Sequence, residues 1–258
     1  MSVLATQVGA LARRSVTRTA RQPASAIPPL VFPLALMAVN AGGLQPSTEL
    51  PGFPTDSFLA FALAVPFIQG ALFSTMNAGT DLARYIQTGF FTRLSLTPMR
   101  GSALLAGQLA GIVTLGVLQA VVYITVGLLV GVRFESGPAG IAVLLLYAAL
   151  VSLGFGALGT FLALRTGSGE SIQRLFPVLF VFLFISSMNT PLDLIAVDWF
   201  RALATLNPVS YLIDCVRSLI ITGWDVQALA LGFGIAIALA IVAIAASSWA
   251  LTRRMERT

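Results

Sequence analysis

Long stretches without a charged residue constrain this chain more than any other feature of its sequence. Residues 101–132 contain no Asp, Glu, Lys or Arg, and similar charge-free stretches recur along the chain. About 20 apolar helical residues cross the ~30 Å hydrocarbon core of a bilayer. Only 10% of the 258 residues are charged, whereas a soluble domain carries roughly a quarter. The chain is therefore predicted to be an integral membrane protein.

The fold class expected from this pattern is an all-α membrane protein with six transmembrane helices. The predicted spans are residues 28–44, 57–79, 101–132, 138–164, 175–189 and 226–251. The first and fifth spans are short. The arginine-bearing N-terminus lacks the short apolar core of a cleavable signal peptide, so none is expected. No soluble domain is predicted, and residues 1–258 form a single transmembrane domain.

The placement of arginine predicts the orientation of these spans. If the N-terminus is cytoplasmic, most of the 15 basic residues fall inside, as the positive-inside rule requires. The predicted cytoplasmic arginines are Arg13, Arg14, Arg18, Arg21, Arg84, Arg93, Arg100, Arg165, Arg174, Arg253, Arg254 and Arg257. Residues 200–223 are apolar but contain Pro208, Asp214 and Arg217, and counting them as a seventh span would reverse the C-terminus. We therefore predict that 190–224 is an extracytoplasmic region with a re-entrant or surface-lying hairpin, and that both termini are cytoplasmic.

Residues 1–27 are expected to form an interfacial helix and a connector. Leu4, Val8 and Leu11 fall at helical spacing among arginines, before prolines that end the pattern. One interpretation is an amphipathic helix over residues 3–21 on the inner leaflet. The alternative is a basic tail that only sets the topology.

The predicted cytoplasmic loop at residues 81–100 combines arginines with aromatic and leucine side chains. Asp81 is expected to cap a short helix, in which Leu82, Tyr85 and Ile86 share one face. Such a loop suits a plug that enters a pocket on a soluble partner. It equally suits an amphipathic helix lying on lipid, and composition does not separate the two.

The end of this loop reads Arg93-Leu-Ser-Leu-Thr97-Pro98-Met-Arg100. It resembles the inner loop of type-2 ATP-binding-cassette permeases, particularly the daunorubicin-resistance-like exporters. In that family the segment is a coupling helix that sits in a groove of the ATPase subunit. The residues that the resemblance marks for ATPase coupling are Asp81, Arg84, Phe90, Arg93, Leu94, Thr97, Pro98 and Arg100.

Two further motifs follow in the family's order. Residues 154–173 are similar to the exit of the fourth span, and residues 206–217 are similar to the C-terminal signature, which forms the outer re-entrant hairpin. The signature residues are Asn207, Pro208, Tyr211, Asp214 and Arg217. Residues 189–193 depart from the family pattern and leave the shape of the outer gate open.

The signature residues also have a reading from their own chemistry. Pro208 disfavours helix at Asn207, so the chain is expected to reverse there. Asp214 and Arg217 are three residues apart and can neutralise each other on one helical face. A structural ion pair and a direct contact with cargo are both compatible with this pattern.

The polar groups inside the predicted spans are uncharged. They are Asn40, Gln69, Asn77, Gln108, Gln119, Tyr123, Ser152 and Ser186. Such groups commonly hold membrane helices together. The alternative is that Asn40, Gln69, Asn77, Gln119 and Tyr123 line a path suited to an amphipathic or lipid-like cargo.

The residue types that the sequence lacks exclude several kinds of functional site. The sequence has no histidine and a single cysteine, Cys215, so no metal site is expected. It has no lysine either, which excludes the phosphate-binding Gly-Lys-Ser/Thr of a P-loop. No catalytic residue can be named, which disfavours a membrane-embedded enzyme. A gradient-driven secondary transporter of hydrophobic compounds is the alternative, although no carboxylate lies at mid-membrane.

The resemblance implies the transmembrane subunit of an ATP-driven exporter in the bacterial plasma membrane. Its expected partners are a separate P-loop ATPase that binds ATP and Mg, a second identical or paralogous permease, and membrane lipids. No nucleic-acid partner and no cofactor in this chain are expected. The implied cargo is a drug, an antibiotic or a lipid-like molecule.

Overall fold

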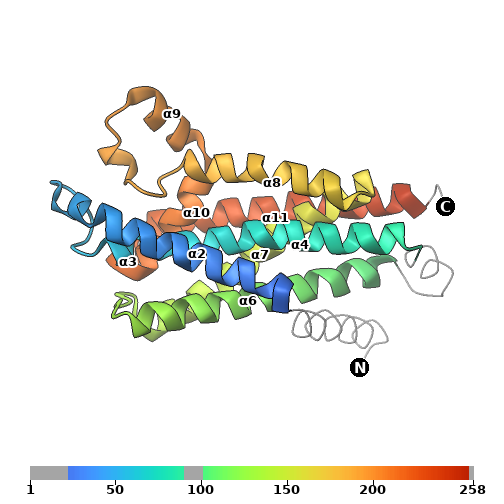
Figure 1. The fold of residues 1–258 in the computed structure, drawn as a ribbon, viewed down its shortest axis with the longest axis horizontal. Helices are drawn as coiled ribbons and strands as arrows, with labels where there is room; N and C mark the ends of the chain where they lie inside the picture. The colour runs from blue at the N-terminus through green and yellow to red at the C-terminus, as the bar shows by residue number, and fades with distance from the viewer. Residues whose placement is uncertain (1–22, 90–100, 256–258) are drawn as a thin grey trace.

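The computed structural model describes residues 23–89 and 101–255, which are helical and contain no strand. Five helices are long and apolar enough to cross a membrane, and they run side by side along the long axis (Figure 1). These helices are α2 (Pro23–Leu44), α4 (Ala64–Gln87), α6 (Gly101–Leu129), α7 (Gly137–Thr166) and α11 (Val226–Met255). The shorter elements are η1 (Gln45–Glu49), α3 (Phe58–Ala62), α8 (Gly169–Phe184), η2 (Leu192–Leu194), α9 (Asp198–Leu206), α10 (Pro208–Arg217) and the π-helical turn η3 (Ser218–Thr222). The predicted interfacial helix lies outside the described residues, as do loop residues 90–100.

The bundle has two ends that differ in charge. One end, here called the hairpin end, carries η1, α9 and the connection between α6 and α7 (left in Figure 1). The opposite end, here called the C-terminal end, carries the last turns of α4, α7 and α11. The described arginines at the C-terminal end are Arg84, Arg165, Arg174, Arg253 and Arg254. Such a cluster of arginines at one end of a helix bundle is typical of multi-pass membrane proteins.

Helix α4 is the centre of the bundle. It packs against α2, α6, α7, α8 and α10. In the span that it forms with α3, 89% of the most apolar window is buried, against 50% or less in the other four candidate spans. Protein rather than lipid surrounds this helix, so it can carry buried polar residues such as Gln69 and Thr75.

A close approach of backbones joins α4 to α7. The hydroxyl of Thr75 donates to the Phe155 carbonyl at 2.9 Å. A Cβ added at Gly159 would lie 2.0 Å from the Thr75 carbonyl oxygen, so only glycine fits there. Small residues that allow such contact are a common device for packing membrane helices, since lipid provides no hydrophobic driving force.

Proline in α2 creates a backbone group that needs an outside partner. Pro33 has no N–H, so the Pro29 carbonyl one turn earlier loses its helical donor. The hydroxyl of Tyr123 on α6 donates to that carbonyl at 2.7 Å. Membrane helices tolerate internal proline when a neighbouring helix supplies such a bond.

The structure corrects the predicted start of the coupling loop. Asp81 does not cap a separate short helix, because α4 continues through it to Gln87. The apolar face continues as well: Leu82 is buried, and Tyr85 and Ile86 pack against the same cluster. This continuous buried face explains why the helix does not end near Gly79, as the predicted span did.

The predicted fifth span, residues 175–189, is also wrong in its bounds. Helix α8 begins earlier because the Ser168 hydroxyl caps it, accepting from the Ser171 N–H at 3.4 Å. It ends at Phe184, and the Asn207 side chain donates to the carbonyls of Phe182 and Ile185. The 16 residues of α8 leave it outside the five candidate spans.

Candidate functional site

The predicted hairpin signature forms two helices that meet at Asn207. Helix α9 ends at Leu206, and Pro208 opens α10, where its missing N–H costs no helical bond. The Asn207 Oδ1 caps α10 by accepting from the Val209 N–H at 3.0 Å. With its Nδ2 on the end of α8, this one buried side chain joins two helix termini.

Helix α10 lies inside the bundle against α4 and α11, whereas α9 lies outside it (Figure 1). Tyr211 on α10 ties the two together, because its hydroxyl donates to the Thr205 carbonyl at 2.8 Å. Tyr147 of α7 donates to the Leu212 carbonyl at 3.2 Å. The hairpin is thus fastened to the bundle along the length of α10.

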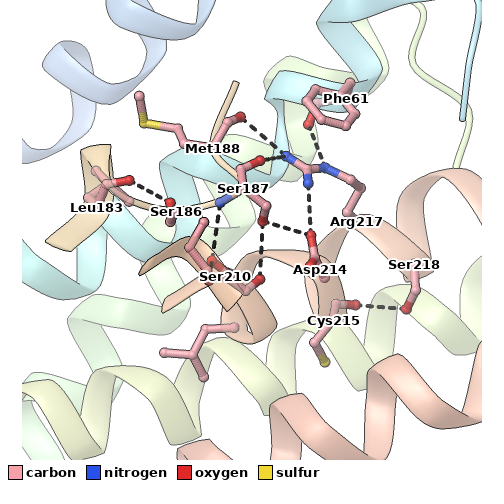
Figure 2. A network of polar contacts seen from close by, with 12 residues as sticks. Phe61, Leu183, Ser186, Ser187, Met188, Ser210, Asp214, Cys215, Arg217 and Ser218 are labelled. Carbon is pink, nitrogen blue, oxygen red and sulfur yellow. Dashed lines mark hydrogen bonds and ion pairs between the residues drawn. The ribbon is translucent and has the colours of Figure 1, made fainter. Parts of the chain in front are cut away.

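Arg217 is the centre of a buried polar network at the hairpin end (Figure 2). Only 7% of the residue is exposed. Its Nη1 contacts Asp214 Oδ1 at 2.8 Å, the ion pair that the three-residue spacing predicts. Its Nη2 donates to the carbonyls of Ser187 and Met188 at 3.1 and 3.2 Å. The guanidinium also stacks 3.5 Å from the centre of the Phe61 ring.

The second half of the network runs through serine hydroxyls. Ser187 donates to Asp214 Oδ1 at 2.9 Å, and its backbone N–H donates to the Ser210 hydroxyl at 3.2 Å. Ser210 in turn donates to the Ala204 carbonyl at 2.7 Å. Figure 2 shows how these groups join α10 to the segment that follows α8.

Burial and the contact between the partners act in opposite directions on the pKa of each group. Burial lowers the pKa of the Arg217 guanidinium to about 10, and contact with Asp214 opposes that shift. Burial also raises the pKa of the Asp214 carboxyl, while Arg217 and Ser187 act against the increase. All three nitrogens of the Arg217 guanidinium donate to groups of the protein itself, and Asp214 accepts two of the network's bonds at Oδ1. The network is therefore suited to holding the hairpin in place.

Sequence reasoning identified Asp214 and Arg217 but missed most of their partners. Phe61 lies in α3, and Ser187 and Met188 follow α8, so these partners come from two segments outside α10. Their contribution depends on tertiary contacts that no local spacing reveals. The sequence offered only a weaker indication of these partners, namely the adjacent Ser186 and Ser187 at the end of an aromatic-rich predicted span.

The described part of the coupling segment lies at the C-terminal end. Asp81 and Arg84 are in the last turns of α4. Gln87 donates from Nε2 to the Gly167 carbonyl after α7 at 3.2 Å, and Arg254 of α11 donates to the Leu164 carbonyl at 2.8 Å. Three helix ends are therefore joined where the loop begins. The remaining coupling residues, Phe90, Arg93, Leu94, Thr97, Pro98 and Arg100, lie outside the described residues.

The predicted path residues occupy several positions in the bundle. Asn40 pairs with Asn189, Nδ2 to Oδ1, at 3.2 Å. Gln119 and Tyr123 both lie against Gly70 of α4. Asn77 is only half-buried, further along α4. Among the other polar span residues, Gln108 donates to the Ala78 carbonyl at 3.1 Å.

Gln69 is one of three described residues with a buried polar side-chain atom that has no hydrogen-bond partner, together with Thr80 and Gln119. Its residue is completely buried in α4, and neither its Nε2 nor its Oε1 has a hydrogen-bond partner among the described residues. The Oε1 of Gln119 shares this condition. An unpartnered buried amide is costly in protein interiors, so each such group calls for an explanation.

No group of three or more metal-ligating side chains occurs in the part of the chain that the structure describes. The described site groups are a buried ion-pair network, a set of joined helix ends, and buried amide atoms without a partner.

The sequence of this chain is similar to a family of known transport proteins. Residues 6–221 match the sequence profile of the family described as ABC-2 type transporter. The chain is 31% identical over 207 residues to the daunorubicin resistance ABC transporter permease protein DrrB1 of Streptomyces coeruleorubidus. That alignment covers 77% of this chain and 69% of the relative.

Proposed function

Because the chain belongs to the ABC-2 type transporter family, we propose that it is the membrane-spanning subunit of an ATP-driven exporter. A separate P-loop ATPase binds ATP and Mg and supplies the energy. The family match is the observation that carries this proposal. The absence of lysine supports the division of labour, because the P-loop motif requires that residue.

Helix α4 is the proposed route from the ATPase to the transport path. It runs from the coupling segment at residues 81–100 into the centre of the bundle. Its backbone contacts α7 closely at Thr75 and Gly159, and the Thr75 hydroxyl bonds the Phe155 carbonyl. A tilt of the coupling segment would thus move α4 and α7 as one unit and favour one of two bundle arrangements.

The proposed topology has six crossings, with both termini in the cytoplasm of a bacterium. Helix α8 supplies the additional crossing, although its 16 residues extend only about 24 Å. The following residues and local bilayer thinning compensate for this mismatch. In this topology α9 and α10 form the re-entrant hairpin on the outer side. A second copy or a paralogue completes the transporter.

The proposed cargo is a hydrophobic or amphipathic molecule such as a drug, an antibiotic or a lipid. Both polar atoms of Gln69 and the Oε1 of Gln119 support this, because buried amide atoms without a partner can bind the polar atoms of an otherwise apolar molecule. The printed name of the relative, which refers to daunorubicin resistance, points to the same class of cargo.

The gradient-driven alternative is less well supported. Within the five candidate spans, the described carboxylates are Glu49 and Asp81, and both lie near span ends. Asp214 is outside those spans and is already paired with Arg217. Ion coupling generally needs an ionisable group near mid-membrane.

Purification from the native membrane tests the proposal. The tagged chain is extracted in mild detergent, and its bound proteins are identified by mass spectrometry. We expect a P-loop ATPase, and we expect its loss when Arg93 and Arg100 are both changed to Glu. Arg174→Glu is the matched control, because it reverses an exposed charge at the same end of the bundle but outside the loop. Recovery of no ATPase, even after crosslinking, would contradict the proposal.

A further inference from the structure

A cavity of about 360 Å³ opens at the hairpin end, and no residue of the Arg217 network is in its lining. Its volume falls within the ~300–1,000 Å³ range of ligand pockets. Three segments enclose it: the residues around the start of α3, the connection between α6 and α7, and the π-helical turn η3. In Figure 1 these segments meet at the left end of the bundle.

Two opposite charges line this cavity without neutralising each other. Arg133 and Glu135 both contribute to the lining, and both are exposed. Neither forms an ion pair within residues 23–89 or 101–255, in contrast to the paired Asp214 and Arg217. The cavity therefore presents one unpaired cation and one unpaired anion to a ligand.

The backbone that carries these charges is fixed. The Glu135 N–H donates to the Ile220 carbonyl at 3.1 Å, and the Ser136 N–H donates to the Leu219 carbonyl at 3.3 Å. The Ser136 hydroxyl adds a bond to the same Leu219 carbonyl at 2.6 Å. The connection is thus tied to η3, and a ligand meets a preformed arrangement, which lowers the entropic cost of binding.

The opposite wall offers hydroxyl hydrogens. The Thr55 hydroxyl accepts from the Ser57 N–H at 3.3 Å, and the Ser57 hydroxyl accepts from the Ala60 N–H at 3.3 Å. Because each oxygen already accepts a backbone N–H, its own hydrogen remains available to donate. Hydroxyl donors together with Arg133 suit a phosphate, whereas Glu135 suits an ammonium group.

The cavity borders an apolar surface. Its lining includes Val130 and Ile221, and the end of α6 beside it exposes 81% of Leu129. Acyl chains can lie against this surface while a headgroup occupies the cavity. A soluble zwitterion would leave the apolar surface unused.

We propose that this cavity binds the headgroup of a zwitterionic phospholipid with a primary ammonium, as in phosphatidylethanolamine. Arg133 and the two hydroxyls hold the phosphate, and Glu135 accepts from the ammonium. A purely anionic headgroup would satisfy Arg133 but face Glu135 unfavourably. The proposal does not depend on the ATPase partner, so it can fail or succeed separately from the proposed function.

Native mass spectrometry of the delipidated, full-length chain tests this site. Phosphatidylethanolamine and phosphatidylglycerol with identical acyl chains are titrated separately. We expect tighter binding of phosphatidylethanolamine. Arg133→Gln should weaken both lipids by about tenfold, as expected for the loss of one charge-assisted contact. Glu135→Gln should remove the preference between them without weakening phosphatidylglycerol.

Two matched variants serve as controls. Glu49→Gln removes an exposed carboxylate at the same end, and Arg174→Gln removes an exposed guanidinium at the other end. Neither should change the preference. The proposal is overturned if Glu135→Gln keeps the wild-type preference, or if the controls abolish it equally. Complete competition by soluble phosphoethanolamine at equal concentration would also overturn it, because the ligand would then be a free zwitterion.

Discussion

Replacing Gln69 with leucine should make the isolated protein more stable and less active. The carboxamide is completely buried, and both of its polar atoms lack a partner among the described residues. Leaving such a group unpaired costs roughly 1–3 kcal/mol, and a leucine of similar size removes that cost without opening a cavity. We therefore expect Gln69→Leu to raise the free energy of unfolding in detergent by about 1–3 kcal/mol.

Gln108 provides a control of the same residue type in the same bundle. Its Nε2 donates to the Ala78 carbonyl at 3.1 Å, so Gln108→Leu removes a bond that is made. That variant should lose about 1 kcal/mol, the usual net value of such a bond. If the two substitutions change the free energy of unfolding in opposite directions, the change depends on whether the glutamine is hydrogen-bonded and not on the residue type.

The activity part of this prediction follows from the proposed cargo path. If the Gln69 amide gains its partner from cargo or in another state of the cycle, Gln69→Leu should lower transport in reconstituted vesicles although the protein is more stable. A stable variant with wild-type transport would refute the role in the path. A destabilised variant would refute the structural premise, because the amide would then be hydrogen-bonded.

Two further substitutions test how the bundle is held together. Arg217→Met should lower the free energy of unfolding by about 3 kcal/mol, because it leaves Asp214 without its ion-pair partner. Breaking a buried ion pair costs roughly 3–5 kcal/mol, and the low end applies because the Asp214 side chain is 31% exposed. A wild-type denaturation midpoint would contradict this. Gly159→Ala should lower thermal stability, because its Cβ would lie 2.0 Å from the Thr75 carbonyl oxygen. Gly234→Ala is the control, because a Cβ there would have nothing within 4 Å; this variant should be neutral or stabilising by up to about 1 kcal/mol. An equal loss of thermal stability in both glycine variants would refute the close contact of α4 and α7.

The sequence was sufficient to predict the membrane class and most long helices. Charge-free apolar stretches determine such helices locally, so α6, α7 and α11 lie close to their predicted bounds. The turn at Asn207 was equally local, because proline restricts the residue before it.

The predictions failed where the outcome depends on contacts between distant segments. Helix α8 ends where the side chain of Asn207, more than twenty residues later in the sequence, donates to carbonyls at the end of that helix. Helix α4 continues through Asp81 because the buried cluster at its end includes residues of other helices. Likewise, Tyr123 fits a path residue by sequence alone, yet its hydroxyl bonds the Pro29 carbonyl that a distant proline leaves free.

Transport by the reconstituted pair tests the central claim most directly. The chain is placed in vesicles together with the P-loop ATPase recovered with it, and movement of a fluorescent amphipathic dye is followed. The account predicts dye movement that requires ATP and stops when the P-loop lysine of the ATPase is replaced. Dye movement driven by a proton or sodium gradient without ATP would contradict it and favour a secondary transporter.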